Sequence, residues 1–147
     1  MLLRLIHYYL QMTTKPLSER NYFWKYNIYW VLWLILISYL SNKPASDLPK
    51  ISLLAFQHAD KLVHAVFYFT LCMLSAYGFS RQHVFKKLHT SALTISLIFS
   101  IAWGALMEIT QLTIFTYRSA EWADFFANTF AALFAILVIR IFKLVKR

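Results

Sequence analysis

The chain consists of long apolar stretches separated by short polar segments. Four of these stretches contain almost no Asp, Glu, Lys or Arg. A helix needs about 20 mostly apolar residues to cross a bilayer, and helices of a soluble bundle would keep a polar face. The pattern therefore predicts an all-α polytopic membrane protein. We expect a bundle of four transmembrane helices near residues 24–41, 62–80, 90–114 and 122–142.

The first helix is preceded by a different kind of segment. Residues 1–12 are apolar but short, and Arg4 and His7 interrupt them. This composition is typical of an amphipathic helix that lies in the membrane interface. Aromatic residues then crowd the start of the first predicted span, as in the aromatic belt of a membrane protein.

Composition supports the same interpretation. The 147 residues suit one domain, here the whole range 1–147, and 60% of them are hydrophobic while 14% are charged. Soluble domains carry about 25% charged residues. Intrinsic disorder is excluded because there is ample apolar material to bury. Cys72 is the only cysteine, which excludes a disulfide scaffold.

The net charge of +9 has a topological meaning. With four spans, eleven of the fifteen Lys and Arg residues fall at the termini and in the second loop, whereas five of the six acidic residues fall on the other side. The positive-inside rule then predicts that both termini are cytoplasmic. Because the basic residues flank apolar spans, the charge gives no support to nucleic-acid binding.

Polar side chains gather at the predicted outer ends of three helices. The second and fourth helices start on this side and the third ends there, so these groups should meet at one depth. The set consists of Asp60, Lys61, His64, Tyr68, Glu108, Gln111, Arg118, Asp124 and Asn128. Ionisable groups that face lipid are costly, so we expect them to face the bundle interior or a wet cavity.

This constellation has three interpretations. In the first, it forms a polar pocket that is open to the outer face. In the second, it is a structural network in which Lys61 and Arg118 pair with Asp60, Glu108 and Asp124. A divalent metal site is the weakest of the three, since one histidine with carboxylates at these spacings is no strong metal signature. We expect no metal and no cofactor.

The fourth predicted helix also carries small residues at every fourth position, namely Ala123, Ala127, Ala131 and Ala135. Small residues at this spacing let helices approach closely in a membrane. The stripe therefore predicts helix packing, and an oligomer could form through it.

Three segments of the chain resemble the signatures of VanZ-like membrane proteins. Residues 60–74 (DKLVHAVFYFTLCML) are similar to the first, residues 108–111 (EITQ) to the second, and residues 118–135 (RSAEWADFFANTFAALFA) to the third. The family is named for a bacterial protein that raises resistance to teicoplanin, a lipid-tailed glycopeptide antibiotic. The resemblance implies a multi-pass protein of the bacterial cytoplasmic (inner) membrane with a role in the cell envelope or in antibiotic resistance.

Three hypotheses for function follow. In the first, the outer pocket binds a lipid-linked envelope precursor or a glycopeptide, and Lys61 and Arg118 hold its anionic groups. In the second, the protein is a membrane-surface enzyme on a lipid-linked substrate, with His64, Glu108 or Asp124 as candidate catalytic residues, although no nucleophile motif accompanies them. In the third, the role is purely structural or oligomeric. A transporter is disfavoured because repeats and broken helices are missing from the sequence.

Overall fold

The structure, a computed structural model, describes residues 18–43, 59–114 and 121–142. These residues form α2 (Glu19–Ser41), α3 (Ala59–Arg81), α4 (Lys86–Thr90), α5 (Ala92–Thr113) and α6 (Trp122–Phe142). The described part is thus all helical, as the sequence predicts. The expected interfacial helix at residues 1–12 and the loop residue Arg118 lie outside the described ranges.

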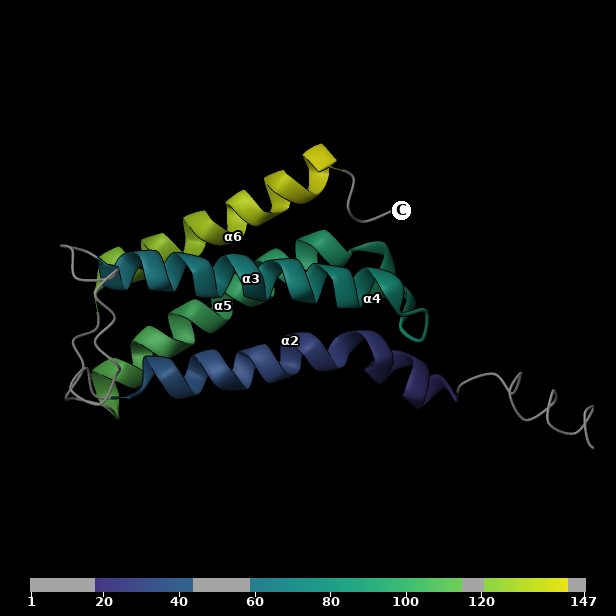
Figure 1. Cartoon of the computed structure of the whole chain (residues 1–147), viewed down its shortest axis with the longest axis horizontal. Coiled ribbons are helices and arrows are strands. Elements are labelled where there is room, and N and C mark those ends of the chain that lie inside the picture. The colour runs from purple at the N-terminus through teal and green to yellow at the C-terminus, as the bar shows by residue number, and fades with distance from the viewer. Residues whose placement is uncertain (1–17, 44–58, 115–120, 143–147) are drawn as a thin grey trace, which may run out of the picture.

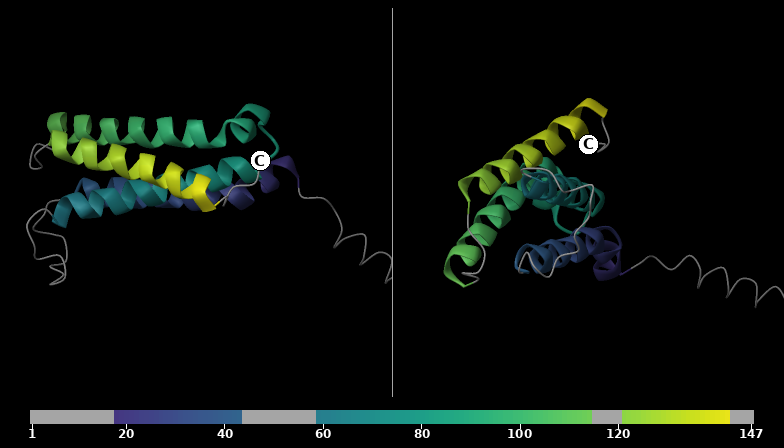
Figure 2. Two further views of the ribbon diagram at one scale, coloured as in Figure 1. Left: turned by 90° about the horizontal axis from the view of Figure 1, so that it is seen from above. Right: turned by 60° about the vertical axis from the view of Figure 1, so that its left-hand side comes forward.

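Helix α3 is the central element of the bundle. It packs against α2, α5 and α6, and α5 also packs against α6. The four long helices run lengthwise through the molecule (Figures 1 and 2). The end of α2, the start of α3, the end of α5 and the start of α6 lie together, on the left in Figure 1. This is the end at which the sequence gathers its polar constellation.

Helix bounds follow local chemistry as well as apolar length. The side chain of Ser18 caps α2 by accepting a hydrogen bond from the backbone N–H of Asn21 at 3.3 Å. The predicted third helix corresponds to α5, which starts two residues later because Ser91, with φ −111° and ψ 26°, separates it from the short α4. Before α4, the buried side chain of Gln82 bonds both the N–H and the carbonyl of Phe85 and so fixes the turn after α3.

Small residues set the close approach of the helices. On α5, the buried face carries Ala92, Ser96, Ser100 and Gly104, again at every fourth position. On α6, Ala131 and Ala135 are buried, Ala127 is half-buried and Ala123 is exposed. The second half of the alanine stripe therefore packs inside the chain, and an oligomer through the whole stripe remains a prediction.

Helix α2 is fastened to its neighbours by side-chain hydrogen bonds. The indole N–H of Trp33 donates to the carbonyl of Phe67 on α3 at 3.0 Å, and that of Trp103 on α5 donates to Ser38 Oγ at 3.2 Å. Indole donors are usually paired when they are buried. These bonds hold α2 in a fixed register against α3 and α5.

The outer surface of the bundle is strongly apolar. Exposed large side chains include Leu32 and Ile35 on α2, Ile98 on α5, and Phe130 and Phe134 on α6. Within the described ranges, three helices are long and apolar enough to cross a membrane, namely α3, α5 and α6. These features fit a membrane protein. The fourth predicted span, near residues 24–41, falls within α2, which is not among these three helices.

Candidate functional site

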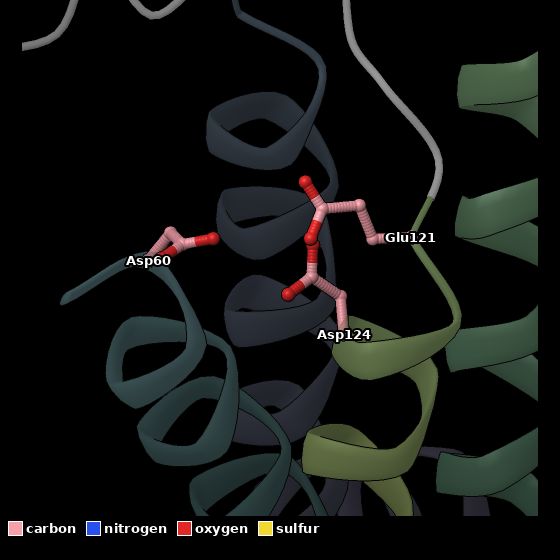
Figure 3. Close-up of side chains that lie close together, drawn as sticks. All are labelled: Asp60, Glu121 and Asp124. Atoms are coloured by element: carbon pink, nitrogen blue, oxygen red, sulfur yellow. The ribbon is translucent and has the colours of Figure 1, made fainter. Parts of the chain in front are cut away.

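A lysine bound by three carboxylates is the main feature of the polar end. The ammonium group of Lys61 lies 2.8 Å from a carboxylate oxygen of Glu121, and 3.0 Å from oxygens of both Asp60 and Asp124. We call these four residues the outer cluster. Figure 3 shows the three acids, which point toward one another from α3 and from the start of α6.

The first turns of two helices position the outer cluster. Asp60 and Lys61 follow directly on the start of α3, and Asp124 lies in the first turn of α6. The carbonyl of Glu121 accepts the backbone N–H groups of Asp124 and Phe125 at 2.9 and 3.3 Å. Acidic residues are favourable at helix N-termini, because the exposed N–H groups carry partial positive charge there. Both helices therefore support the carboxylates that surround Lys61.

The three acids have the spacing of a cation site. One carboxylate oxygen from each of Asp60, Glu121 and Asp124 lies within 4.8 Å of the others. Three carboxylate oxygens at this spacing could bind a hard metal ion. The Lys61 ammonium is hydrogen-bonded to all three acids, so lysine itself supplies a positive charge at this position.

The end of α5 joins the outer cluster through the backbone. Glu108 Oε2 accepts the N–H of Glu121 at 3.2 Å, which connects α5 to the start of α6. Gln111 is buried, and its amide donates to the carbonyl of Ser41 at 2.8 Å. Gln111 therefore ties α5 to the end of α2, a contact that holds the helices together at this level.

A second polar layer lies deeper, between α3, α5 and α6. His64 and Tyr68 follow Lys61 by one and two helical turns and are both buried. Asn128 follows Asp124 by one turn on α6 and is only 1% exposed. A Cβ at Gly104 would lie 3.4 Å from the Tyr68 ring and 3.4 Å from the Asn128 amide nitrogen, so these three residues meet. Polar side chains therefore continue from the outer cluster into the apolar part of the bundle.

One comparison with known proteins identifies the chain. A family model described as VanZ/LLP1 matches residues 10–143.

The chain belongs to the VanZ/LLP1 family.

The comparisons with curated proteins and with solved structures give no match. Membership agrees with the resemblance seen in the sequence, and with the three membrane-compatible helices it supports a VanZ-like membrane protein.

Much of the predicted constellation of this VanZ/LLP1 protein is brought together at one end of the bundle. Lys61 and Asp124 pair directly, although they are 63 positions apart in the sequence. Asp60 shares Lys61 but is exposed, so it lies at the rim and not on the buried face with His64 and Tyr68. Of the residues predicted to bind ligand, Arg118 lies outside the described part of the chain.

Sequence reasoning missed one member of the outer cluster. Glu121 makes the shortest of the three Lys61 ion pairs, at 2.8 Å, yet it precedes α6 and lies outside the apolar stretch. Its spacing of three residues before Asp124 is the signal that could have found it, because residues three apart at a helix start share one side.

Proposed function

We propose that this VanZ/LLP1 protein is a four-span protein of the cytoplasmic membrane whose outer cluster binds the polar headgroup of a lipid-linked envelope component. The observation that carries this proposal is the position of the cluster. Four charged side chains from α3 and from the start of α6 converge at one end of a bundle whose outer surface is strongly apolar. The carboxylate of Asp124 is nearly buried between the helices, and buried ionisable groups in membrane proteins are costly and mark functional sites.

Helix α2 is the proposed fourth span. It has 23 residues and is thus about 34 Å long, which suffices to cross a bilayer core about 30 Å thick. Its exposed face is apolar, with Ile28, Leu32, Ile35, Leu36 and Tyr39. Helices α2 and α3 lie alongside one another (Figure 1), so a bilayer that covers α3 would cover α2 as well.

The orientation is proposed from the charges at the two ends of the bundle. The end opposite the outer cluster carries Lys25, Arg81, Lys86, Lys87 and Arg140. Basic residues next to spans favour the cytoplasmic side. Both termini would then be cytoplasmic, and the outer cluster would face the outside of the cell.

Cysteine accessibility tests this orientation. In a Cys72→Ala background, we expect Thr113→Cys at the outer end of α5 to react with a membrane-impermeant maleimide in intact cells. We expect His83→Cys, between α3 and α4, to react only after the membrane is opened. Both native residues are exposed in the bundle, so accessibility would report on the membrane side. Labelling of position 83 in intact cells, with position 113 protected, would reverse the topology.

The charge balance of the outer cluster indicates which headgroup it would take. Three carboxylates surround one ammonium group, so the positive charge of Lys61 is already neutralised. The sequence suggested that Lys61 holds an anionic group, but the described cluster favours groups that donate hydrogen bonds, such as amines and hydroxyls. We therefore propose a headgroup that is rich in amine or hydroxyl groups, as in aminosugars, glycerol or peptide stems.

Lipid analysis tests the binding proposal. We expect the full-length protein, purified in a mild detergent, to retain a headgroup of this class above its share in the membrane extract. Glu121→Gln with Asp124→Asn should lose that enrichment. Glu19→Gln is the control, because it makes one of these two chemical changes at an exposed position at the opposite end of the bundle. Absence of any enriched lipid in the unmodified protein, or equal loss in the control, would contradict the proposal.

A further inference from the structure

Two cations and two tyrosine rings lie together at the end of the bundle opposite the outer cluster. The Lys25 ammonium is 5.4 Å from the centre of the Tyr26 ring on α2, and the Arg81 guanidinium is 5.4 Å from that of Tyr77 on α3. The two tyrosine rings pack edge to face, with their centres 6.3 Å apart. Cations are attracted to aromatic faces at such distances. We call these four residues the inner cluster.

Contacts between α2 and the end of α3 hold the inner cluster in place. The hydroxyl of Tyr22 donates to the backbone carbonyl of Arg81 at 3.3 Å, and its ring stacks on that of His83 at 5.7 Å. The charges of Lys25 and Arg81 both act on this hydroxyl, so both cations lie near it. Because Arg81 uses its backbone in this contact, its guanidinium group is not occupied by it.

The cations of the inner cluster lack an anionic partner among the described residues. Both side chains are exposed, and no ion pair joins Lys25 or Arg81 to a described acid. Of the described acids only Glu19 lies at this end of the bundle, and it is exposed as well. Two positive groups that are held close together without a counterion attract an anion. The inner cluster is therefore opposite in character to the outer cluster.

The depth of the inner cluster indicates which anion it would meet. Arg81 is the last residue of α3, whose 23 residues make it about 34 Å long, slightly more than a bilayer core of about 30 Å. The end of α3 would therefore lie at the level of the lipid headgroups. Next to Lys25 on α2, the exposed side chains of Trp24, Ile28 and Tyr29 offer an apolar surface for acyl chains.

We propose that the inner cluster binds the phosphate group of an anionic phospholipid, with Lys25 and Arg81 as its cationic contacts. A guanidinium group bonds phosphate oxygens through a fork of N–H donors, and a lysine ammonium adds a point charge. A zwitterionic headgroup would bring its own positive group toward the same two cations and would be disfavoured. The proposal does not depend on the proposed function, because it concerns the other end of the bundle and a ligand of opposite charge.

Lipid binding to the delipidated full-length protein tests the inner cluster. Phosphatidic acid and phosphatidylcholine with the same acyl chains are titrated in a mild detergent, and bound lipids are counted by native mass spectrometry. Phosphatidic acid is the probe because its headgroup adds no amine or alcohol for the outer cluster. We expect its Kd to be at least about tenfold lower than that of phosphatidylcholine. Equal Kd values for the two lipids would overturn the proposal.

Paired charge removals locate the binding. Lys25→Gln with Arg81→Gln should weaken binding of phosphatidic acid about 25-fold, since each basic residue beside an anionic headgroup contributes about fivefold. Lys86→Gln with Lys87→Gln is the matched control, because it removes the same charge from exposed positions at the same end of the bundle. The control should weaken binding less than about threefold, because more distant charges are screened. Equal weakening in both double variants would overturn the site, since net charge alone would then attract the lipid.

A neutral substitution separates a built site from general attraction. Tyr77→Leu keeps every charge but removes the ring beside Arg81, and it should weaken binding of phosphatidic acid about threefold. Tyr39→Leu is the matched control, because it removes an exposed ring beside Lys43 at the opposite end of α2, and it should leave binding unchanged. The same loss in both variants, or in neither, would contradict the site. SDS unfolding midpoints are measured in parallel, so Tyr77→Leu still decides the question if the double variant folds poorly.

Two further arms separate the lipid from other sources and from the outer cluster. A large molar excess of inorganic phosphate should not displace phosphatidic acid, because the acyl chains add contacts that a free ion lacks; displacement would mean that the site takes a soluble anion and would overturn the lipid. Glu121→Gln with Asp124→Asn should leave binding of phosphatidic acid unchanged, and a loss there would contradict a separate inner site. Failure of the lipid enrichment proposed for the outer cluster would leave these measurements unaffected.

Discussion

Replacing Lys61 with methionine removes the only positive charge of the outer cluster while keeping most of its apolar stem. The ammonium group bonds three carboxylates at 2.8–3.0 Å. These acids differ in burial: the side chain of Asp124 is 9% exposed, whereas those of Glu121 and Asp60 are 47% and 53% exposed. The substitution therefore leaves one nearly buried carboxylate without this cation, next to two further acids.

The expected cost comes mainly from Asp124. Removing one partner of a buried ion pair costs about 3–5 kcal/mol, and exposed pairs are worth about 0.2–1 kcal/mol. Because the Lys61 side chain is 24% exposed, water screens this ion pair in part. We therefore expect Lys61→Met to lower the free energy of unfolding by about 2–3 kcal/mol, which is less than for a fully buried pair. Lys61→Arg keeps the charge and should cost less than Lys61→Met.

Double variants separate the buried pair from the exposed ones. Lys61→Met with Asp124→Asn should recover more than half of the loss, because no buried charge is then left without its cation. Lys61→Met with Asp60→Asn is the matched control and should recover only about 0.5 kcal/mol. Unfolding in mixed micelles with increasing SDS, followed by tryptophan fluorescence, gives the free energies. Equal recovery in the two double variants, or a cost of Lys61→Met below that of Lys61→Arg, would refute the reasoning.

Three further predictions concern the packing of the bundle. Gly78→Ala should lower the free energy of unfolding by about 1–3 kcal/mol in the same SDS titration, because its Cβ would lie 2.8 Å from the backbone oxygen of Tyr26; an unchanged midpoint would mean that α2 and α3 do not cross so closely. Gln111→Ala should lower the free energy of unfolding by about 1–2 kcal/mol, because the buried hydrogen bond to the Ser41 carbonyl is lost. A loss below about 0.5 kcal/mol would mean that water already competes for this hydrogen bond. Cys72 is fully buried, so a permeant maleimide should label it only after SDS unfolding, and rapid labelling of the native protein would contradict this packing.

The helices could be predicted from the sequence because apolar length and helix length nearly coincide in a membrane protein. The bounds of α6, Trp122–Phe142, are those predicted, and α3 extends the prediction by three residues at its start and by one at its end. Helix α2 starts at Glu19, earlier than the predicted residue 24, because the Ser18 cap sets its start. The prediction places the start where charged residues end the apolar stretch. The start of α5 at Ala92 lies two residues after the predicted start, because the polar segment Lys86–Thr90 precedes it and marks the end of the apolar stretch.

The candidate site could be predicted only in part, since spacing along one helix is visible in a sequence but pairing between helices is not. The one-turn spacing of Lys61 and His64 placed both toward the interior, and burial of His64 agrees with this. The ion pair from Lys61 to Glu121 spans 60 positions and depends on how α3 and α6 cross. Glu121 is also polar and exposed, so nothing in the apolar pattern distinguishes it from an ordinary surface acid.

The polar site and the close packing of the helices depend on the same face of α5. Small residues at every fourth position bring α5 against its neighbours, and the last of them, Gly104, lies at Asn128 and Tyr68. One turn further along the helix, Glu108 accepts the backbone N–H of Glu121 and so holds the start of α6 next to Lys61. A large residue at Gly104 would therefore press on Asn128 and Tyr68 and push α5 away from α3 and α6 below the outer cluster. Because helices transmit such shifts as rigid elements, substitutions in the packing face should alter the outer cluster even where they touch none of its side chains.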